Sequence, residues 1–286
     1  MTNILITGAN GQLGSEINAI APKYDKYNFF FTDVKALDIT NKEAVQNYLT
    51  NNNINTIINC AAYTAVDKAE SEPALANNIN HLAVANFAQL AKDKNIKLIH
   101  ISTDYVFDGK AHTPYSETDL PNPPSVYGKT KLAGEQAMQK INPANSIIIR
   151  TSWVYSKYGN NFVKTMLRIA KERDEINVVA DQIGTPTNAA DLAQTILAIL
   201  PKIKNEEVEL YHYSNEGVCS WYDFAKAIFE IKGLTIQVHP IETSQYPTPA
   251  KRPFYSVLNK ASIKERYKVT IPYWKDSLAV CMDKMK

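Results

Sequence analysis

Cysteine is scarce in this chain of 286 residues, and its few copies are widely spaced. Cys60, Cys219 and Cys281 are the only three. An odd number of distant thiols does not suit a disulfide framework and predicts reduced cysteines in a cytoplasmic protein. The five histidines are scattered as well, and the sequence contains no His-x-x-x-His or Cys-x-x-Cys pair. We therefore expect no zinc site.

Long hydrophobic runs and an excess of one charge are also missing. The longest apolar stretches, such as Ser146–Ile149 and Ile96–Ile101, are far shorter than the ~20 residues of a membrane-spanning helix. The first residues enter a strand-like run without a basic segment or a cleavage site, so we expect no signal peptide. Basic and acidic residues number 31 and 29, for a net charge of +2, which does not indicate nucleic-acid binding. Small anionic ligands remain compatible with this balance.

Short β-rich runs alternate with segments of helical spacing along most of the chain. Strands are expected at residues 3–7, 28–32, 56–59, 97–102, 146–151, 177–179 and 210–213, and helices near residues 12–21, 41–52, 73–94, 124–140, 158–173 and 188–201. Most of the runs are continuously apolar, as strands covered on both faces are. This alternation predicts an α/β fold, a Rossmann-type doubly wound parallel sheet.

Three glycines lie between the first expected strand and the first expected helix. Gly8, Gly11 and Gly14 follow the spacing G-x-x-G-x-x-G. The first glycine permits a tight turn, the second lets the backbone approach a pyrophosphate, and the third lets the helix pack closely on the sheet. The N–H groups at the start of the helix attract the anion. Glycines alone also fit a plain turn, but this position favours a dinucleotide site.

An acidic residue at the end of the second expected strand supports the same interpretation. Asp33 can accept hydrogen bonds from the adenine ribose hydroxyls and repels a 2′-phosphate. The alternative is an Asx-turn at the end of a strand. Asp38 and Ile39 begin the next segment and can flank the adenine, and residues Ala61–Tyr63 follow the third strand where phosphates and ribose would pass. We expect NADPH or NADH as the cofactor.

The domain boundary is placed near the end of the fifth expected strand. We expect residues 1–151 to form the NAD(P)-binding Rossmann domain, joined by segments near residues 176–213 that return to the sheet. Residues 152–286 are expected to form mainly a smaller substrate-binding lobe. Proline and tyrosine accumulate between Pro240 and Tyr255, which is too rich in proline for a core element.

A Tyr-x-x-x-Lys motif occurs twice, and position separates the two copies. Tyr127 and Lys131 follow the fourth expected strand, whose end carries Thr103, and ligands bind at the carboxyl edge of such sheets. Tyr222 and Lys226 belong to an expected helix in the C-terminal lobe, where a packing role is the simpler interpretation.

The chemistry of the first copy suits the reduction of a ketone. Residues four apart share one helix face, so Lys131 can approach the phenol of Tyr127. A nearby cation is expected to lower the pKa of that phenol, which prepares it to donate a proton. A hydroxyl from Thr103, or from Ser102, can hydrogen-bond the carbonyl oxygen as charge develops on it.

These residues resemble the extended short-chain dehydrogenases/reductases, and the likeness runs nearly end to end. The glycine motif and Tyr-x-x-x-Lys are general to such reductases, whereas other matching strings are more specific. The specific strings are Thr64–Glu70, Ser102–Phe107, Thr151–Tyr155 and Tyr246–Pro253.

The resemblance implies reduction of the C4 ketone of dTDP-4-dehydro-β-L-rhamnose, and it extends the set of site residues. The catalytic residues it implies are Thr103, Tyr127 and Lys131. Together with the motifs above, it assigns cofactor contacts to Gly8, Asn10, Gly11, Gln12, Leu13, Gly14, Asp33, Asp38, Ile39, Ala61, Ala62, Tyr63, Thr64, Tyr127 and Lys131. Substrate contacts fall on Thr103, Asp104, Tyr127 and Trp153, and the basic Arg252 is added for the diphosphate because a planar guanidinium binds phosphate in a bidentate manner.

One departure from the family concerns Mg²⁺. Some members bridge a dimer with Mg²⁺ held by acidic side chains, one of which follows a Pro-Thr-x-Ala string. Here Ala190 stands in that place, although Glu16 in the first helix matches the other acid and Asp191 is the next residue. Half a carboxylate site holds Mg²⁺ poorly. We therefore expect a monomer without Mg²⁺, with a homodimer as the alternative.

Two other functions remain open on the sequence alone. A related reductase or epimerase of another nucleotide sugar would share the fold and most motifs. A regulatory subunit that binds the cofactor without catalysis would share the fold, which by itself does not decide function. The complete set of Thr103, Tyr127 and Lys131 argues against the regulatory subunit. In every case the expected partner is a nucleotide sugar, with neither nucleic acid nor membrane.

Overall fold

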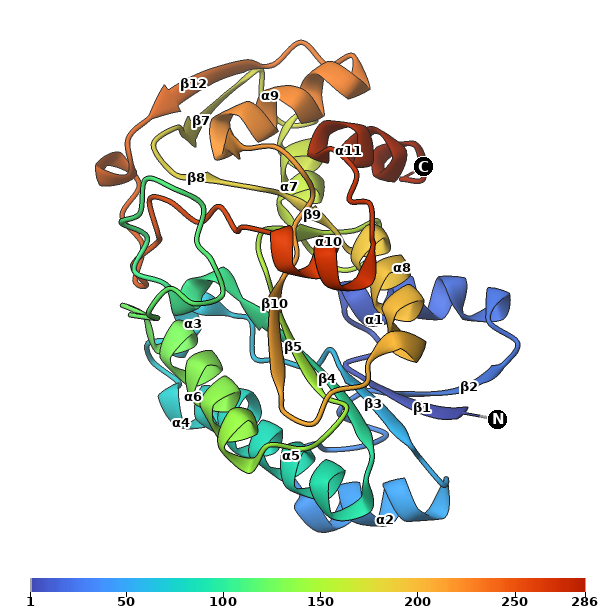
Figure 1. Cartoon of the computed structure of the whole chain (residues 1–286). Coiled ribbons are helices and arrows are strands. Elements are labelled where there is room, and N and C mark those ends of the chain that lie inside the picture. Colours follow the sequence, from blue (N-terminus) through green and yellow to red (C-terminus); the bar gives the residue numbers. More distant parts are fainter. Residues whose placement is uncertain (1, 286) are drawn as a thin grey trace.

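The computed structural model describes residues 2–285, and a six-stranded parallel sheet forms its centre (Figure 1). The strands of this sheet are β1 (Thr2–Thr7), β2 (Tyr27–Thr32), β3 (Thr56–Asn59), β4 (Lys97–Thr103), β5 (Ile147–Thr151) and β10 (Glu209–His212). They lie in the order β10-β5-β4-β3-β1-β2, and every neighbouring pair is parallel. The doubly wound parallel sheet predicted from the sequence is confirmed.

Helices cover both faces of the sheet, which explains why its strands are almost continuously apolar. The helices are α1 (Gln12–Ile20) and α8 (Ala189–Ile199) on one face, and α2 (Lys42–Asn51), α5 (Ala83–Lys94) and α6 (Val126–Ile141) on the other. Side chains alternate along a strand, so Ile4 and Ile6 enter the core beneath α1 and α8, whereas Leu5 enters the opposite core.

The strand order reverses between β1 and β3. The chain leaves β1 for β2 on one side and then crosses to β3 on the other. Their carboxyl ends are level, because Thr7 pairs with Asn59, and Thr103 at the end of β4 pairs with Thr151 at the end of β5. Ligands of open α/β sheets bind in the crevice outside such a reversal. The register therefore brings the loops after β1, β3 and β4 to one edge.

The helix expected over residues 73–94 contains a change of pitch. It consists of α4 (Pro73–Asn77), a π-helical turn (Asn78–Leu82) and α5. Asn80 in the π-helical turn is buried, accepts a hydrogen bond from the Tyr63 N–H at 2.9 Å and donates one to the Tyr63 carbonyl at 3.1 Å. The wider turn thus fixes the loop that follows β3, a role often seen for π-helical segments at functional sites.

Two expected strands, near residues 177 and 210, belong to different sheets. The strand near residue 210 is β10, which pairs with β5 at the edge of the main sheet. The strand near residue 177 is β7 (Glu175–Val179), which instead pairs with β12 (Gln237–Ile241) in a separate two-stranded sheet. The expectation that β7 returns to the main sheet is wrong. Of its five residues only Val178 is buried, so β7 lacks the character of a strand covered on both faces.

A second apolar core lies beneath β7 and β12, in the upper part of Figure 1. It includes residues of α7 (Phe162–Ile169), α9 (Trp221–Lys232) and α11 (Trp274–Asp283). In contrast, α10 (Ala261–Tyr267) returns to the main core through Ile263 and Tyr267. The C-terminal third of the chain therefore contributes to both cores.

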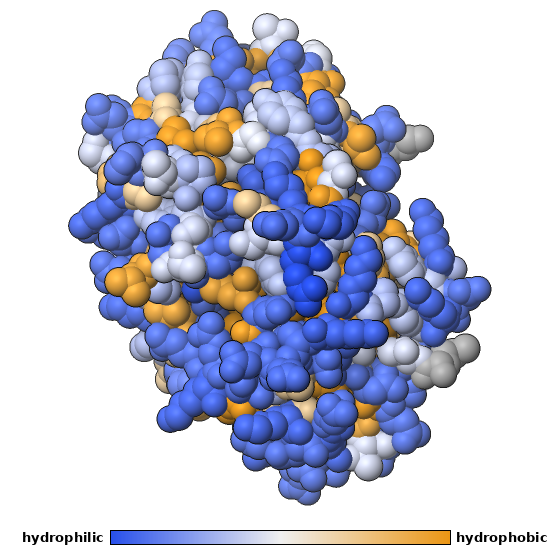
Figure 2. Space-filling view, in the orientation of Figure 1, coloured by the Kyte–Doolittle hydropathy of each residue, from blue (hydrophilic) through white to orange (hydrophobic). Residues whose placement is uncertain are grey.

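Hydrophilic residues cover most of the face seen in Figure 2, with apolar residues in small groups between them. Within residues 2–285, none of the helices has both the length and the apolar character needed to span a membrane.

Candidate active site

The carboxyl edge of the sheet opens into a cavity of about 890 Å³. Nearly all of the predicted cofactor residues line it. Those residues are Gly8, Asn10, Gly11, Gln12, Leu13, Asp33, Asp38, Ile39, Ala61, Ala62, Thr64, Tyr127 and Lys131. Thr103, Asp104 and Trp153 line the same cavity. The structure thus brings together residues from the loops after β1, β2, β3, β4 and β5 with those of α6.

Gly14 and Tyr63 are the two predicted cofactor residues outside the lining of this cavity. A Cβ atom at Gly14 would lie 2.5 Å from the carbonyl oxygen of Gly8, so this glycine permits the close approach of α1 to the preceding turn. The Tyr63 backbone is held by Asn80, and its hydroxyl donates a hydrogen bond to Glu72 at 2.5 Å. Gly14 and Tyr63 therefore shape the neighbouring loops.

The turn between β1 and α1 requires its first glycine. Gly8 has φ +63°, and a Cβ atom there would lie 2.8 Å from the backbone of Ala61. This close approach brings the loop after β3 against the turn after β1. Gly11 is the N-cap of α1, and no side chain caps this helix end. The open N-terminus, with its partial positive charge, suits a phosphate group.

Asp33 is oriented by three hydrogen bonds at the end of β2. One carboxylate oxygen accepts from the backbone N–H groups of Lys35 at 3.0 Å and Ala36 at 3.1 Å. The other accepts from the side-chain amide of Asn10 at 2.5 Å. The Asx-turn weighed for this residue is therefore present. Asn10 joins the loops after β1 and β2 and holds the carboxylate at the cavity.

Tyr127 lies in the first turn of α6, against the segment that follows β4. The hydroxyl of Ser125 caps this helix by accepting from the Gly128 N–H at 3.1 Å. Gly128 packs so closely on the carbonyl of Tyr105 that a side chain there would clash. The Tyr105 ring meets the Tyr127 ring edge-on, with centroids 5.4 Å apart. These contacts fix the phenol beside Thr103 and Asp104.

Burial, rather than the lysine, dominates the titration of Tyr127. Loss of solvent raises the pKa of this phenol well above its ordinary value, and hydrogen bonding with Thr103 opposes the rise only in part. We expected Lys131 to lower this pKa, and that expectation is wrong, because Lys131 is not among the groups that shift it. The Lys131 ammonium instead donates to the Ile101 carbonyl at 2.6 Å and faces the His100 ring at 3.3 Å. Its own pKa is lowered to about 8 by burial.

Asp104 is a buried carboxylate with one unused oxygen. Its Oδ1 accepts from the Thr103 hydroxyl at 3.0 Å, whereas Oδ2 has no hydrogen-bond partner among residues 2–285. Burial raises the pKa of this carboxyl to about 6, although the Thr103 hydrogen bond opposes the rise. A buried acceptor without a partner is costly, and the buried Ser256 hydroxyl is close enough to this carboxyl to oppose the rise in its pKa.

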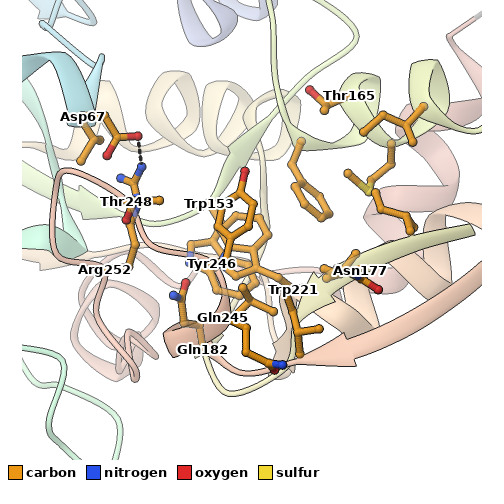
Figure 3. A pocket seen from close by; sticks show the side chains of 18 of the residues that line it. Asp67, Trp153, Thr165, Asn177, Gln182, Trp221, Gln245, Tyr246, Thr248 and Arg252 are labelled. Atoms are coloured by element: carbon orange, nitrogen blue, oxygen red, sulfur yellow. Dashed lines mark hydrogen bonds and ion pairs between the residues drawn. The ribbon is translucent and has the colours of Figure 1, made fainter.

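A second cavity, of about 1280 Å³, adjoins the first (Figure 3). Residues that line both cavities are Thr64, Val66, Tyr105, Trp153 and Val154. Trp153 stacks on Trp221 of α9 with ring centroids 3.6 Å apart. It does so with φ +48°, a backbone conformation that is rare for a bulky residue and often marks a functional site.

Arg252 lies in the second cavity (Figure 3), which Tyr127 does not line. Its guanidinium forms an ion pair with Asp67 of α3 (Val66–Ala69) at 2.6 Å. It also donates to the Tyr105 hydroxyl at 3.2 Å. Arg252 therefore links the proline-rich C-terminal loop to the segment beside Tyr127. The other Tyr-x-x-x-Lys pair is remote from this chemistry, because neither Tyr222 nor Lys226 lines either cavity.

Sequence reasoning missed several residues that shape the site. Asp67 lies within a string that matched the reductases, but no pattern joined it to Arg252. Trp221 follows Ser220, which caps α9, and nothing in the sequence indicated its stacking on Trp153. Asn80 falls within the helix expected over residues 73–94, and no pattern in the sequence indicated its hydrogen bonds to Tyr63.

The two acids considered for Mg²⁺ are engaged inside the protein. Glu16 is buried and accepts from the Ser156 hydroxyl at 2.6 Å. Asp191 accepts from Ser277 at 2.5 Å and from Asn215 at 2.8 Å. Across residues 2–285 no three His, Cys, Asp or Glu side chains are grouped as metal ligands.

The raised pKa of Asp104 makes a prediction about stability. A carboxyl whose pKa rises from 3.8 to about 6 on folding favours the folded state at low pH and loses that stabilisation as pH rises through 6. Asp104→Asn should therefore increase the free energy of unfolding at pH 7 to 8, on the order of 1–3 kcal/mol. The gain should vanish near pH 4, as measured by urea unfolding across this range.

Asp108→Asn is the matched control. Burial raises the pKa of Asp108, but hydrogen bonds from the Lys110 backbone and the Tyr115 hydroxyl outweigh it and leave the pKa lowered. This variant should lose stability at neutral pH instead. An Asp104→Asn protein that is no more stable than the parent at pH 8 would contradict the electrostatic explanation.

Comparisons with known proteins agree with this geometry. A family model described as the RmlD substrate binding domain matches residues 1–286. A dTDP-4-dehydrorhamnose reductase of Aggregatibacter actinomycetemcomitans is 43% identical over 288 residues, which cover 97% of each chain.

Solved structures give the same result. The crystal structure of a dTDP-4-dehydrorhamnose reductase from Clostridium acetobutylicum has a TM-score of 0.94 and 45% identity, with 99% of both chains covered. The enzyme of that name from Bacillus anthracis, solved in complex with NADP, has a TM-score of 0.93 and 42% identity over 99% of this chain and 100% of the other. The likeness to these dTDP-4-dehydrorhamnose reductases extends over nearly the whole chain. The chain belongs to the RmlD substrate binding domain family.

Proposed function

We propose that this protein reduces the C4 ketone of dTDP-4-dehydro-β-L-rhamnose with NADPH or NADH and yields dTDP-L-rhamnose. The observation that carries the proposal is that Thr103, Tyr127 and Lys131 line one cavity, which shares Tyr105 and Trp153 with a second cavity. A nicotinamide cofactor fits the first cavity, and a nucleotide sugar can extend from Tyr127 into the second. The names of the full-length relatives support the same reaction.

The residues of the first cavity suit a dinucleotide. The open N-terminus of α1 and the close backbone approach at Gly8 can hold the diphosphate, and Asp33 can hold the adenine ribose. When bound, the reduced nicotinamide supplies a hydride to the ketone carbon. Asp33 favours free ribose hydroxyls, and the cation of Lys35 can offset its charge toward a 2′-phosphate, so both cofactors are accepted.

The proton comes from Tyr127. Its raised pKa keeps the phenol protonated at neutral pH, which is the form that a general acid requires. As negative charge develops on the C4 oxygen, that oxygen takes the Tyr127 proton, while the Thr103 hydroxyl turns from Asp104 and donates its hydrogen bond to the same oxygen. Asp104 and Trp153, which line the same cavity as Tyr127, hold the sugar in place.

The first test removes the acid. Tyr127→Phe should bind the cofactor normally and lose about a hundredfold or more in kcat, the usual contribution of general acid catalysis. The assay follows the loss of reduced-nicotinamide absorbance with a panel of nucleotide 4-keto-sugars. Tyr222→Phe, which removes the hydroxyl from the other Tyr-x-x-x-Lys pair, is the control and should retain wild-type turnover.

The same assay separates the alternative functions. Wild-type activity only on another nucleotide sugar would indicate a related reductase or epimerase. Cofactor binding without turnover of any sugar would indicate a regulatory subunit. Wild-type turnover in Tyr127→Phe would rule out the proposed mechanism.

The second test concerns the diphosphate of the substrate. We propose that it binds Arg252, whose guanidinium lies in the second cavity in contact with Asp67 and Tyr105. Arg252→Ala should raise KM for the nucleotide sugar at least about tenfold, consistent with the loss of charge-assisted hydrogen bonds, and should leave cofactor affinity unchanged. Arg168→Ala removes an exposed arginine paired with Glu172 and should change neither value. An unaltered KM in Arg252→Ala would assign the diphosphate to other residues.

The third test concerns assembly. We propose a monomer that needs no Mg²⁺, because Ala190 stands where bridged relatives have an acid, and because Glu16 is buried against Ser156. Light scattering should give the mass of one chain, and EDTA should alter neither the mass nor the activity. A dimer that dissociates on chelation would contradict this proposal.

A further inference from the structure

A buried polar chain crosses the sheet and ends at Lys131. At the end of β3, the side-chain amide oxygen Oδ1 of Asn59 accepts from the Thr7 hydroxyl at 2.7 Å and from the Ala61 N–H at 3.2 Å. The Asn59 amide nitrogen lies 3.1 Å from Nδ1 of His100 on β4. Nε2 of the same ring lies 3.3 Å from the Lys131 ammonium nitrogen. His100 is fully buried, and Asn59 and Lys131 are each only 1% exposed.

The direction of these hydrogen bonds fixes the tautomer of His100. The Ala61 backbone N–H can only donate, so the oxygen of the Asn59 amide must face it. The NH₂ group of Asn59 therefore faces His100, and Nδ1 must accept. A neutral imidazole carries one proton, which must then be on Nε2. The ring thus points an N–H group at Lys131, where a lysine would ordinarily find an acceptor.

This N–H group disfavours the charged form of Lys131. A second donor directed at an ammonium is repulsive, whereas the lone pair of a neutral amine can accept from it. Burial lowers the pKa of His100 well below its ordinary value, and Lys131 adds to this effect. The ring thus stays neutral and keeps its single proton on Nε2. Burial lowers the pKa of Lys131 to about 8, and the N–H group of His100 acts in the same direction.

The other groups around Lys131 favour its charged form. The Ile101 carbonyl accepts from the ammonium at 2.6 Å. Glu135, one helical turn along α6, raises the pKa of Lys131. However, Glu135 is itself neutralised by Arg150 of β5 at 2.6 Å. Beyond burial itself, His100 is the neighbour whose contact opposes the ammonium.

We propose that His100, oriented by Asn59, is a positioning residue that makes the Lys131 ammonium a ready proton donor for the regeneration of Tyr127. The inference rests on the proposed function. After Tyr127 gives its proton to the C4 oxygen, an N–H bond of the ammonium breaks, a water molecule in the cavity that both residues line carries the proton, and the phenol O–H bond forms again. The amine left behind accepts a hydrogen bond from His100 Nε2–H and later regains a proton from water. This step is a proton transfer, in which nothing is oxidised or reduced.

The test is the pKa of Lys131 in variants of His100. His100→Leu removes the opposing N–H group, so the pKa of Lys131 should rise by roughly one unit, as expected for the loss of one hydrogen bond of ~1 kcal/mol. The pKa is measured from the NMR signal of ¹³C-labelled lysine side chains, assigned to Lys131 by its absence in Lys131→Met. The fall in the reduction rate at alkaline pH should move upward by the same amount, since the ammonium then persists to higher pH.

Two further variants separate this role from a general effect of losing a buried ring. His100→Gln can accept from Asn59 with its oxygen and direct its NH₂ group at Lys131, so it should restore the wild-type pKa and pH profile. His212→Leu removes an equally buried histidine on β10, whose Nε2 faces Arg150 at 3.5 Å. It should lower stability without moving the pKa of Lys131.

The outcomes are distinct from those that test the proposed function. A wild-type protein that reduces no nucleotide sugar overturns the proposed function, while the pKa measurement still tests the role of His100. An active wild type with an unchanged Lys131 pKa in His100→Leu overturns the inference alone. If the leucine variant does not fold, the ¹⁵N shifts of His100 in the wild type decide, because a proton on Nδ1 would overturn the argument.

Discussion

The ion pair between Glu135 and Arg150 fixes the helix that carries Tyr127 and Lys131. Arg150 of β5 donates from Nε to both oxygens of Glu135, at 3.0 Å and 3.2 Å, and from Nη2 at 2.6 Å. Both side chains are almost fully buried, Ser102 donates a further hydrogen bond to Glu135, and Arg150 lies over the ring of Phe107. A buried pair stabilises a fold only with such complete hydrogen bonding. Loss of either partner would leave an unpaired charge and release α6 from the sheet.

This pair also makes the burial of Lys131 tolerable. A cation fully removed from water is costly, and Glu135 provides a negative charge four residues away on the same helix. Because Arg150 already satisfies Glu135, the help is partial, and Lys131 remains easy to deprotonate. Burial acts on Tyr127 and Asp104 in the same sense, since each favours its neutral form. Burial therefore favours the neutral forms of all three groups.

The fold and the centre of the site were predictable because they depend on local patterns. Continuous apolar runs marked the strands. Gly8, Gly11 and the Tyr127–Lys131 spacing marked the cavity that these residues line. Contacts between distant segments were not predictable. Nothing in the strand containing His100 indicates that its ring lies between Asn59 and Lys131, because that contact depends on the register of β3 against β4. The pKa of Tyr127 was predicted in the wrong direction, since spacing along a helix does not reveal that the ammonium is bound by the Ile101 carbonyl.

The second cavity is coupled to the first through one aromatic residue. The Tyr105 hydroxyl accepts from Arg252, and its ring packs edge-on against Tyr127. The carboxylate of Asp67 forms an ion pair with the guanidinium of Arg252. A diphosphate bound to Arg252, as we propose, would present similar oxygen geometry with more charge, so it would compete with Asp67 and shift the groups that Arg252 touches. Tyr105 is the nearest of them to the acid. Contacts made far from the ketone can therefore adjust the position of the proton donor, which is how binding energy remote from the reacting atoms contributes to catalysis.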